Sequence, residues 1–404
     1  MRTAALNWMP FLGTSTGASR RAVELHSRLT RRFPITICAT EGLRRSARER
    51  MEGAEIRELA PCRTLPVRLL EGSSAWWRRA LVGLDVGLWS TDTLPLVRIP
   101  GAATCLTVHD LRFLHRTRFL GLGRYLLLLL RMRSALRRAD AVVTVSAWTA
   151  GRIREKYGVP EERLHVVPNA VDPAMGRETE RLPRTLDQPY ILAVGHLERR
   201  KNLLALVDAF AGLDASPGCL LVLAGADGGA AAGLRRAAEG AGVGDRIVMT
   251  GRVSEDRLAS LYSGCSVLAC PSLYEGFGMT LLEGMSMGVP VVASAIPPHR
   301  EVGGDVPLWV EPGPDMAGGF RDAISQVLEE SERAREMGER GRERARMFSW
   351  DESARLLGEV YYALLGGREG AEERPGSEGG CGQYSSGEGG RPEHDHAHKG
   401  HEGR

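Results

Sequence analysis

The strongest constraint on the fold is an alternation between short apolar segments and segments whose apolar residues recur with helical spacing. The first half of the chain contains predicted strands near 3–9, 34–40, 55–59, 86–89, 103–108, 141–145 and 163–167, and predicted helices near 17–32, 121–138 and 147–157. The second half contains the predicted strands YILAVG, CLLVLAG, RIVMTG, SVLACP and VPVVAS, which alternate with predicted helices near 201–212, 229–241, 254–263 and 279–287. Strands that are apolar on both faces and are followed by a helix are typical of parallel sheets covered on both sides. The chain is therefore predicted to be α/β, with two doubly wound domains.

The boundary between the two series is predicted at 172–188, a polar segment with two prolines that fits neither period. This boundary places a first domain over 1–171 and a second over 189–349, followed by a closing helix over 350–365. The last segment, 366–404, consists mostly of Gly, Glu, Ser and His and has almost no apolar residues. Such a composition cannot bury a core, so we expect a disordered, solvated tail.

Several protein classes are excluded at this stage. No window holds 18 consecutive apolar residues, so no membrane-spanning helix is predicted. The N-terminus has only a short apolar stretch, interrupted by Asn7 and Pro10, and it resembles a strand and loop more than a secretory signal. The seven cysteines form no CxxC pair and mostly lie in apolar runs, which is typical of buried thiols in a cytoplasmic protein.

Charge is distributed unevenly along the chain. Residues 1–170 carry 28 basic and 14 acidic side chains, whereas the remainder carries 25 basic and 36 acidic ones. The stretch 118–138 combines a run of leucines with arginines on a predicted helix, which suits docking to an anionic membrane surface at the inner face of the plasma membrane. The alternative is that the leucines belong to the core and the arginines are solvated. No nucleic-acid partner is predicted, because the basic residues lack interleaved aromatic side chains and a recognised module.

The segment ILAVGHLERRKNLLALVDAF is a candidate anion site. Its strand ends at Gly195, and Arg200 and Lys201 follow at the predicted start of a helix. Open parallel sheets bind ligands beyond the carboxyl ends of their strands, where helix N-termini attract negative charge. Two cations at this position favour an anionic ligand, and the alternative is a solvated basic helix start.

The segment PSLYEGFGMTLLEGMSMGVPVVAS places two carboxylates at a second such edge. Glu275 precedes a glycine-rich turn, and Glu283 lies about one turn into the following helix. Gly276 and Gly278 allow a ligand to approach the backbone closely. Free backbone N–H donors are expected at Gly278, Met279 and Thr280. The two carboxylates can hold two parts of one ligand, or they are a turn acid and an exposed helix carboxylate.

These two segments resemble signatures of family 4 retaining glycosyltransferases. VGHLERRKN resembles the VGxLxxRKN segment of that family, and EGFGMTLLE resembles its E-x7-E motif. The segments VHDL, VTVSAWTAGRI, VVPNAVD, GVPVVAS and EVGGDVPLWVEP match the same family in order and spacing. The resemblance covers about residues 1–365. It implies a GT-B fold, in which two Rossmann-like domains face a cleft and a C-terminal helix returns toward the first domain.

The resemblance also implies roles for individual residues. Arg200 and Lys201 would neutralise the diphosphate of a nucleotide sugar, Glu283 would bind the ribose hydroxyls, and Glu275 would bind hydroxyls of the transferred sugar. The remaining donor contacts would come from Gly195, Arg252, Val253, Phe277, Gly278, Met279 and Thr280, with the backbone of 277–279 holding the sugar and 251–253 flanking the base. No metal ion is expected, because no Asp-x-Asp pattern is placed to bind one.

In the first half, His109 of the VHDL segment follows a predicted strand, and the resemblance places it beside the donor sugar as a fourth catalytic residue. The loop from Gly13 to Gly17 is expected to border the acceptor and phosphate site. Related sequences often have GxGxY there, whereas this chain has TGASRR, which puts the acceptor contacts in doubt.

The resulting hypothesis is a retaining, metal-independent hexosyltransferase of polysaccharide or cell-envelope glycan synthesis. Mannose from GDP-mannose is favoured, UDP-sugars come next, and the acceptor is a glycan or a lipid-linked sugar. The nucleotide diphosphate sugar is a co-substrate, and no further cofactor is expected. The alternatives are a non-transferring sugar-nucleotide enzyme of the epimerase type and a non-catalytic glycan-binding protein.

Overall fold

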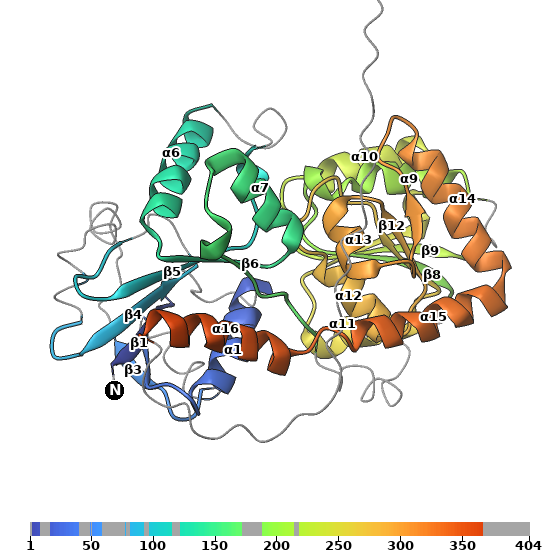
Figure 1. Ribbon diagram of the computed structural model, residues 1–404. Coiled ribbons are helices and arrows are strands. Elements are labelled where there is room, and N and C mark those ends of the chain that lie inside the picture. The colour runs from blue at the N-terminus through green and yellow to red at the C-terminus, as the bar shows by residue number, and fades with distance from the viewer. Residues whose placement is uncertain are drawn as a thin grey trace, which may run out of the picture. The chain divides into compact units, whose positions relative to one another are not determined.

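The computed structural model describes residues 2–8, 17–39, 49, 51–58, 77, 81–92, 97–114, 122–171, 188–213 and 218–366. The described chain forms two separate, wholly parallel sheets (Figure 1). The first sheet has seven strands in the order β3-β2-β1-β4-β5-β6-β7. Its strands are β1 (Thr3–Asn7), β2 (Ile35–Ala39), β3 (Glu55–Glu58), β4 (Val86–Thr91), β5 (Ala103–Val108), β6 (Ala141–Thr144) and β7 (Leu164–Val166).

The second sheet has six strands in the order β10-β9-β8-β11-β12-β13. Its strands are β8 (Tyr190–Val194), β9 (Leu220–Ala224), β10 (Ile247–Gly251), β11 (Val267–Cys270), β12 (Val291–Ser294) and β13 (Leu308–Val310). Every residue of β4, β11 and β12 is buried, which is the pattern of strands covered by helices on both faces. The prediction of two doubly wound parallel sheets is confirmed.

Helices connect the strands, and their apolar faces cover the sheets. In the first half they are α1 (Gly17–Leu29), α6 (Leu122–Arg138) and α7 (Ala147–Tyr157). In the second half they are α9 (Leu203–Ala211), α10 (Ala231–Gly240), α11 (Glu255–Gly264), α12 (Met279–Ser286), α13 (Pro297–Gly303), α14 (Met316–Glu329), α15 (Ser331–Ala345) and α16 (Trp350–Leu364). Ser146, Ser254 and Ser349 cap the N-termini of α7, α11 and α16 with their side-chain oxygens, which explains why these helices begin there.

The last helix, α16, returns to the first sheet, as the resemblance implied. Trp350, Leu357 and Val360 belong to the same buried cluster as residues of β1, β2 and α1. The hydroxyl of Tyr361 lies 2.9 Å from Nε2 of His26 on α1, and both side chains are buried. In Figure 1 the red α16 and the blue α1 lie side by side, in agreement with these contacts.

Three details differ from the sequence-based expectations. Arg200 and Lys201 are not in the first turn of a long helix; they lie in the short 3₁₀ helix η5 (Arg199–Lys201). Asn202 then adopts a left-handed conformation with φ of 52°, so α9 begins one residue later. The short strand β13 and the proline-initiated helix α13 were not predicted as such.

Other expectations fall on residues that the structure does not describe. They concern Gly13, all but the last residue of the predicted linker at 172–188, and the predicted tail beyond Gly366. Within the described part of the chain, no helix combines the length and apolar character needed to cross a bilayer.

Candidate active site

Most of the predicted donor residues lie where the strand order of the second sheet reverses. From β8 the chain continues to β9 on one side, and it later returns to place β11 on the other side of β8. The carboxyl ends of β8 and β11 are therefore neighbours, and the loops that follow them diverge around a common space. Gly195 follows β8, and the segment from Ser272 to Gly278 follows β11. The topology thus brings together the two sequence segments singled out for their cations and carboxylates.

The centre of this site is an ion cluster around Glu275. Its Oε1 atom lies 2.8 Å from Nη1 of Arg200 and 2.8 Å from Nζ of Lys201. The hydroxyl of Ser272 donates a third hydrogen bond of 2.8 Å to the same oxygen. Arg200 also contacts Glu198, with Nε and Oε1 2.7 Å apart. The crowded cations therefore have carboxylate partners from the protein itself, which sequence reasoning had not foreseen.

Electrostatics keep this cluster charged. Burial by itself disfavours the ionised form of Glu275, but the charges of Lys201 and Arg200 outweigh it and hold the pKa of this carboxyl well below its usual range. Burial opposes the charge of Arg200 as well, and Glu275 and Glu198 raise its pKa above the usual value. The side chains of Arg200 and Lys201 are only 16% and 13% exposed, so the cluster is poorly screened by solvent.

Gly195 provides the space that Lys201 occupies. Its φ of 128° is unfavourable for other residues, and a β-carbon at this position would lie 2.9 Å from Cε of Lys201. A side chain at position 195 would therefore displace the ammonium group from Glu275. The expected role of Gly195 in the donor site is thus indirect in this structure, because it lets a cation reach the site.

The N-terminus of α12 forms a second part of the site. Gly278 precedes this helix with φ of 123°, and no side chain caps the first turn. The side chain of Phe277 is buried against Phe348, with ring centroids 5.8 Å apart, so only its backbone can face a ligand. Met279 and Thr280 are partly exposed. The N–H groups at the start of α12 are consequently donors suited to hydroxyl or anionic oxygen atoms.

Glu283 lies on α12, as expected, but it is not an exposed helix carboxylate. Its side chain is 14% exposed, and its Oε2 accepts a 2.8 Å hydrogen bond from the hydroxyl of Tyr262. Oε1 lies 3.9 Å from Nη1 of Arg20 on α1. Burial raises the pKa of Glu283, and the hydrogen bond from Tyr262 only partly offsets that effect. Tyr262 and Arg20 are functional candidates that the sequence analysis missed.

His109 lies at the end of β5, at the carboxyl edge of the first sheet, as predicted. Its Nε2 atom is 3.2 Å from Oδ2 of Asp92, which follows the neighbouring strand β4. The carbonyl oxygen of His109 is so close to Gly276 that a β-carbon there would lie 2.0 Å from it. The first sheet therefore approaches the loop that carries Glu275, and only glycine fits at the contact.

Further contacts hold that loop against the first sheet. The hydroxyl of Ser146 donates a 2.7 Å hydrogen bond to the carbonyl oxygen of Gly276. The hydroxyl of Tyr274 accepts a 3.0 Å bond from the backbone N–H of Leu111. Glu301 on α13 accepts bonds from the first backbone N–H groups of α7, at Ala147 and Trp148, at 2.7 and 3.0 Å. None of these contacts was predicted, because they join residues more than 120 positions apart.

The three other candidate residues that the structure describes are Arg252, Val253 and Gly17. Arg252 and Val253 follow β10, which β9 separates from β8; Arg252 is exposed, and Val253 packs on the core. Gly17 is exposed at the start of α1, and a β-carbon there would meet nothing within 4 Å. The predicted roles of these residues remain predictions.

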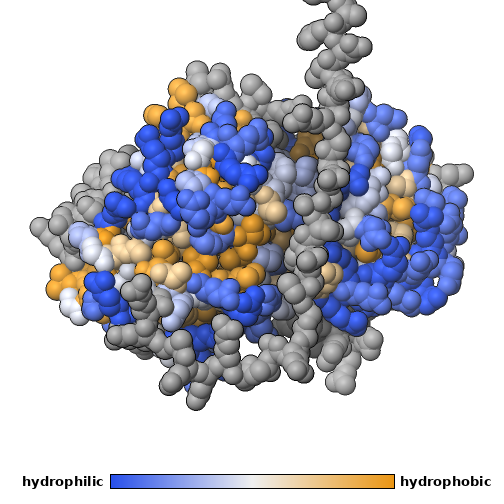
Figure 2. Space-filling model, in the orientation of Figure 1, coloured by the Kyte–Doolittle hydropathy of each residue, from blue (hydrophilic) through white to orange (hydrophobic). Residues whose placement is uncertain are grey.

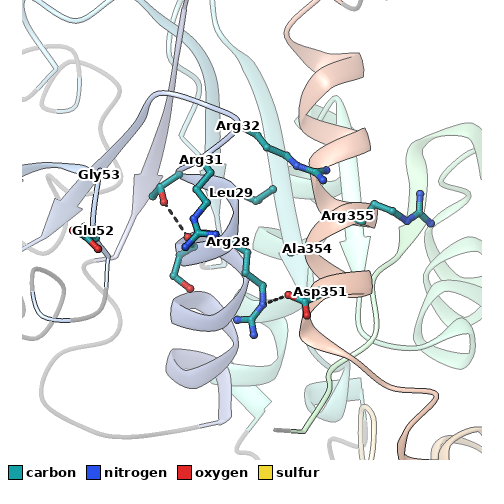
Figure 3. Close-up of a pocket in the computed structure, with 11 residues that line it drawn as sticks. Arg28, Leu29, Arg31, Arg32, Glu52, Gly53, Asp351, Ala354 and Arg355 are labelled. Atoms are coloured by element: carbon teal, nitrogen blue, oxygen red, sulfur yellow. Dashed lines mark hydrogen bonds and ion pairs between the residues drawn. The ribbon is translucent and has the colours of Figure 1, made fainter. Parts of the chain in front are cut away.

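A cavity of about 760 Å³ lies elsewhere, between the end of α1 and the start of α16 (Figure 3). Four arginines line it: Arg28, Arg31, Arg32 and Arg355. Two of them are neutralised, because Arg28 pairs with Asp351 at 2.7 Å and Arg355 pairs with Glu352 at 2.6 Å. None of the predicted site residues lines this cavity, and its chemistry does not match theirs. We therefore do not assign the donor site to it.

The described residues include no group of three or more His, Cys, Asp and Glu side chains arranged to hold a metal ion. The polar groups recorded at the site are two cations, two carboxylates and a helix N-terminus, and the backbone carbonyl of His109 approaches the same loop. Such a set fits a ligand that carries both anionic and hydroxyl groups.

Comparisons with protein families agree with this chemistry. Residues 15–175 match the family model described as Glycosyltransferase Family 4. Residues 176–344 match the model described as Glycosyl transferases group 1. The two matches are contiguous and together include every predicted site residue except Gly13.

Three curated relatives illustrate the range of similar proteins. A 2-deoxystreptamine N-acetyl-D-glucosaminyltransferase of Streptomyces fradiae is 31% identical over 64% of this chain and 65% of its own length. A D-inositol 3-phosphate glycosyltransferase of Xylanimonas cellulosilytica is 33% identical over 55% of this chain and 57% of its own. The serotype-specific mannosyltransferase WbdA of Escherichia coli is 27% identical over 68% of this chain and 35% of its own. The chain thus matches less than two thirds of the length of each relative.

Solved structures with the same architecture cover nearly the whole chain. A sucrose-phosphate synthase of Thermosynechococcus elongatus superposes with a TM-score of 0.71 at 20% identity, covering 91% of this chain and all of its own. Anabaena Alr3699/HepE in complex with UDP and glucose gives a TM-score of 0.71 at 15% identity, covering 90% of this chain and 100% of its own. At these identities the likeness concerns the fold.

Proposed function

Since the chain belongs to the group 1 family of glycosyl transferases and has the GT-B fold, we propose that it transfers a hexose from a nucleotide diphosphate sugar. The acceptor is a hydroxyl group, and the configuration at the anomeric carbon is retained. The observation that carries this proposal is the cluster of Arg200, Lys201 and Glu275 at the switch point of the second sheet, beside the N-terminus of α12. Cations and helix N–H groups match a diphosphate, and carboxylates match sugar hydroxyls.

The proposed chemistry requires stabilisation of a leaving group. When the anomeric carbon–oxygen bond breaks, negative charge develops on the diphosphate oxygen. Arg200 and Lys201 lie at the carboxyl ends of the strands, where they can exchange their contact with Glu275 for the diphosphate and stabilise that charge. In the front-face reaction that the family suggests, the leaving oxygen itself accepts the proton of the acceptor hydroxyl, and no protein nucleophile is needed. The two cations would neutralise the negative charge of the diphosphate, which a metal ion neutralises in other enzymes. We therefore propose that transfer is metal-independent.

The sugar and the acceptor are the open parts of this proposal. Mannose is our first candidate because the VHDL and VGHLERRKN segments resemble the mannosyltransferase-type branch of the family, and a mannosyltransferase is among the relatives. N-Acetylglucosamine is the second candidate, because another relative is named for its transfer. We propose a glycan or lipid-linked sugar as acceptor. The ring polyols in the names of two relatives, 2-deoxystreptamine and D-inositol 3-phosphate, form a second acceptor class to test.

The test is a screen of GDP-, UDP-, ADP- and dTDP-sugars by thermal shift, followed by product analysis with and without acceptors. We expect one donor to raise the unfolding midpoint and to give an α-linked product in the presence of EDTA. An altered sugar that is released without an acceptor would support an epimerase-type enzyme instead. Binding without any turnover would support a glycan- or nucleotide-binding protein.

We also propose that α6 docks the protein to an anionic membrane at the cytoplasmic face. Leu126, Leu127 and Leu130 are 46%, 47% and 66% exposed, and Arg131 and Arg133 lie on the same helix. Hydrophobic residues are visible at the upper left of Figure 2, over α6. Leu128 and Leu129 pack on the core, so only part of the leucine run serves the fold. Exposed leucines beside arginines are suited to the interface of anionic lipids.

Sedimentation with vesicles tests this docking. We expect binding to phosphatidylglycerol-containing vesicles at low salt, and none to phosphatidylcholine vesicles. Replacing Leu126, Leu127 and Leu130 by serine should abolish binding without changing the donor-induced thermal shift. Equal binding of this variant would refute the role of α6.

A further inference from the structure

Asp92 and His109 form a pair at the carboxyl edge of the first sheet. Asp92 follows β4, His109 follows β5, and these strands are adjacent and parallel, so both side chains emerge at the same edge. Nε2 of His109 lies 3.2 Å from Oδ2 of Asp92. The side chain of Asp92 is 13% exposed and that of His109 is 27% exposed. The carboxylate is therefore the more enclosed partner, and the imidazole faces outward from it.

Asp92 is held in its ionised form by its surroundings. Burial alone would raise the pKa of Asp92, but the hydrogen bonds from His109 and Thr107 and the proximity of His26 outweigh burial and lower it. The buried guanidinium of Arg21 on α1 also interacts electrostatically with Asp92. Two further titratable groups of the described chain interact with Asp92: Cys105 on β5 and Tyr361 on α16.

An ionised carboxylate can only accept hydrogen bonds, and this property fixes the imidazole. The nitrogen that faces Asp92 must carry a proton, so a neutral His109 has its hydrogen on Nε2 and its lone pair on Nδ1. We propose that Asp92 is a positioning residue, which selects this tautomer and turns Nδ1 of His109 toward a hydroxyl of the donor sugar. The contact with the sugar rests on the function proposed above, whereas the tautomer does not.

The competing explanation is that the pair simply ties the ends of β4 and β5 together. Under that explanation, the amide of an Asp92→Asn variant would serve equally well, because it can hydrogen-bond to either form of the ring. Under our proposal it would not, because an amide can donate as well as accept and so permits both tautomers. Asp140 supplies a matched control: its carboxylate caps the other end of β5, accepting from the N–H of Thr104 at 2.8 Å.

The first measurement is ¹⁵N NMR of histidine-labelled full-length protein at a pH where the imidazoles are neutral. His109 is assigned by the signals lost in His109→Gln. We expect a single Nε2–H tautomer in the wild type and in Asp140→Asn, and an exchanging mixture in Asp92→Asn. An Nδ1–H tautomer or a mixture in the wild type would overturn the proposal, whatever reaction the protein catalyses.

The second measurement is steady-state transfer with the donor identified by the screen. We expect kcat to fall by about 10–100-fold in Asp92→Asn, with KM for the donor changed less than threefold. Losses of this size are typical of residues that orient a functional histidine through a hydrogen bond. Asp140→Asn should retain wild-type kcat. Unchanged kcat in Asp92→Asn would overturn the positioning role. If the wild type transfers no sugar while His109 shows the single tautomer, the proposed function fails and the assignment of the tautomer stands.

Discussion

Glu275 and Lys201 are joined through a single carboxylate oxygen, with Oε1 and Nζ 2.8 Å apart, and both side chains are largely buried. Arg200 binds the same oxygen. The groups proposed to hold the diphosphate and the sugar thus satisfy one another in the ligand-free protein. A bound diphosphate would compete with Glu275 for the two cations, and it would leave the carboxylate available for sugar hydroxyls.

Glu275→Gln tests this competition. The substitution removes the carboxylate but keeps a similar shape, so Lys201 loses its recorded carboxylate partner and Arg200 keeps only its pair with Glu198. We expect the free energy of unfolding to fall by about 3 kcal/mol, as for other buried pairs that lose one partner. We expect transfer to fall at least 100-fold, whereas affinity for the nucleoside diphosphate, measured by calorimetry, stays equal or increases. Weaker nucleotide binding in this variant would show that Glu275 does not compete with the diphosphate for Arg200 and Lys201.

Replacing Arg200 and Lys201 together by alanine should have the opposite signature. Each charged hydrogen bond to the diphosphate is worth about 1.5–3 kcal/mol, so affinity should fall at least 100-fold. Arg199→Ala is the control, because this neighbouring arginine is exposed. Calorimetry with the nucleoside diphosphate measures both. Unchanged affinity in the double variant would show that the diphosphate does not bind at Arg200 and Lys201.

Gly276→Ala probes the approach of the two sheets. The added β-carbon would lie 2.0 Å from the carbonyl oxygen of His109, so the loop that carries Glu275 must move away. We expect transfer to fall at least tenfold, with each sheet still folded by circular dichroism. Gly233→Ala is the control, because its β-carbon would meet nothing within 4 Å and helix α10 should be slightly stabilised. Wild-type activity of Gly276→Ala would show that this contact is dispensable for transfer.

The sequence predicted most of the fold because the local signals agree with the final structure. The strands of both sheets other than β13 were found from apolar runs, and the two segments that follow β8 and β11 were recognised as ligand-binding from their residue types. Helix α13 and β13 were missed because the first begins with two prolines and the second has only three residues. A segment of three residues carries little periodic signal, although β7, which is equally short, was found.

Partners within the site could not be predicted, because they depend on which strands become neighbours. Asp92 and His109 are 17 residues apart, and only the pairing of β4 with β5 shows that their side chains meet. Glu301 lies on α13 of the second half, and it binds the start of α7 in the first half. Nothing in the sequence around either residue indicates this contact. Sequence reasoning therefore identified the residues that carry charge, but not how those charges are compensated.

Acid should destabilise the protein through two buried histidines. Burial lowers the pKa of His26 and of His299 from 6.5 to about 4, because their charged forms are desolvated in the folded state. As the pH falls below about 6.5, the unfolded chain takes up protons that the folded chain does not, so stability is lost between pH 6.5 and 4. Each histidine contributes up to about 3 kcal/mol to this loss.

Urea denaturation at a series of pH values measures this dependence. His299→Gln should reduce the slope between pH 6.5 and 4, and replacement of the exposed His196 should leave it unchanged. Equal slopes for wild type and His299→Gln would show that His299 is protonated in the folded protein.

The central claim is that the cluster around Glu275 binds a nucleotide diphosphate sugar. The most direct test is a calorimetric titration with the donor that the thermal-shift screen selects. The titration compares the wild type with the double variant Arg200→Ala, Lys201→Ala. Our account predicts one-to-one binding to the wild type and an affinity at least 100-fold weaker in the double variant. Equal affinity in the two proteins, or no binding of any donor to the wild type, would contradict it.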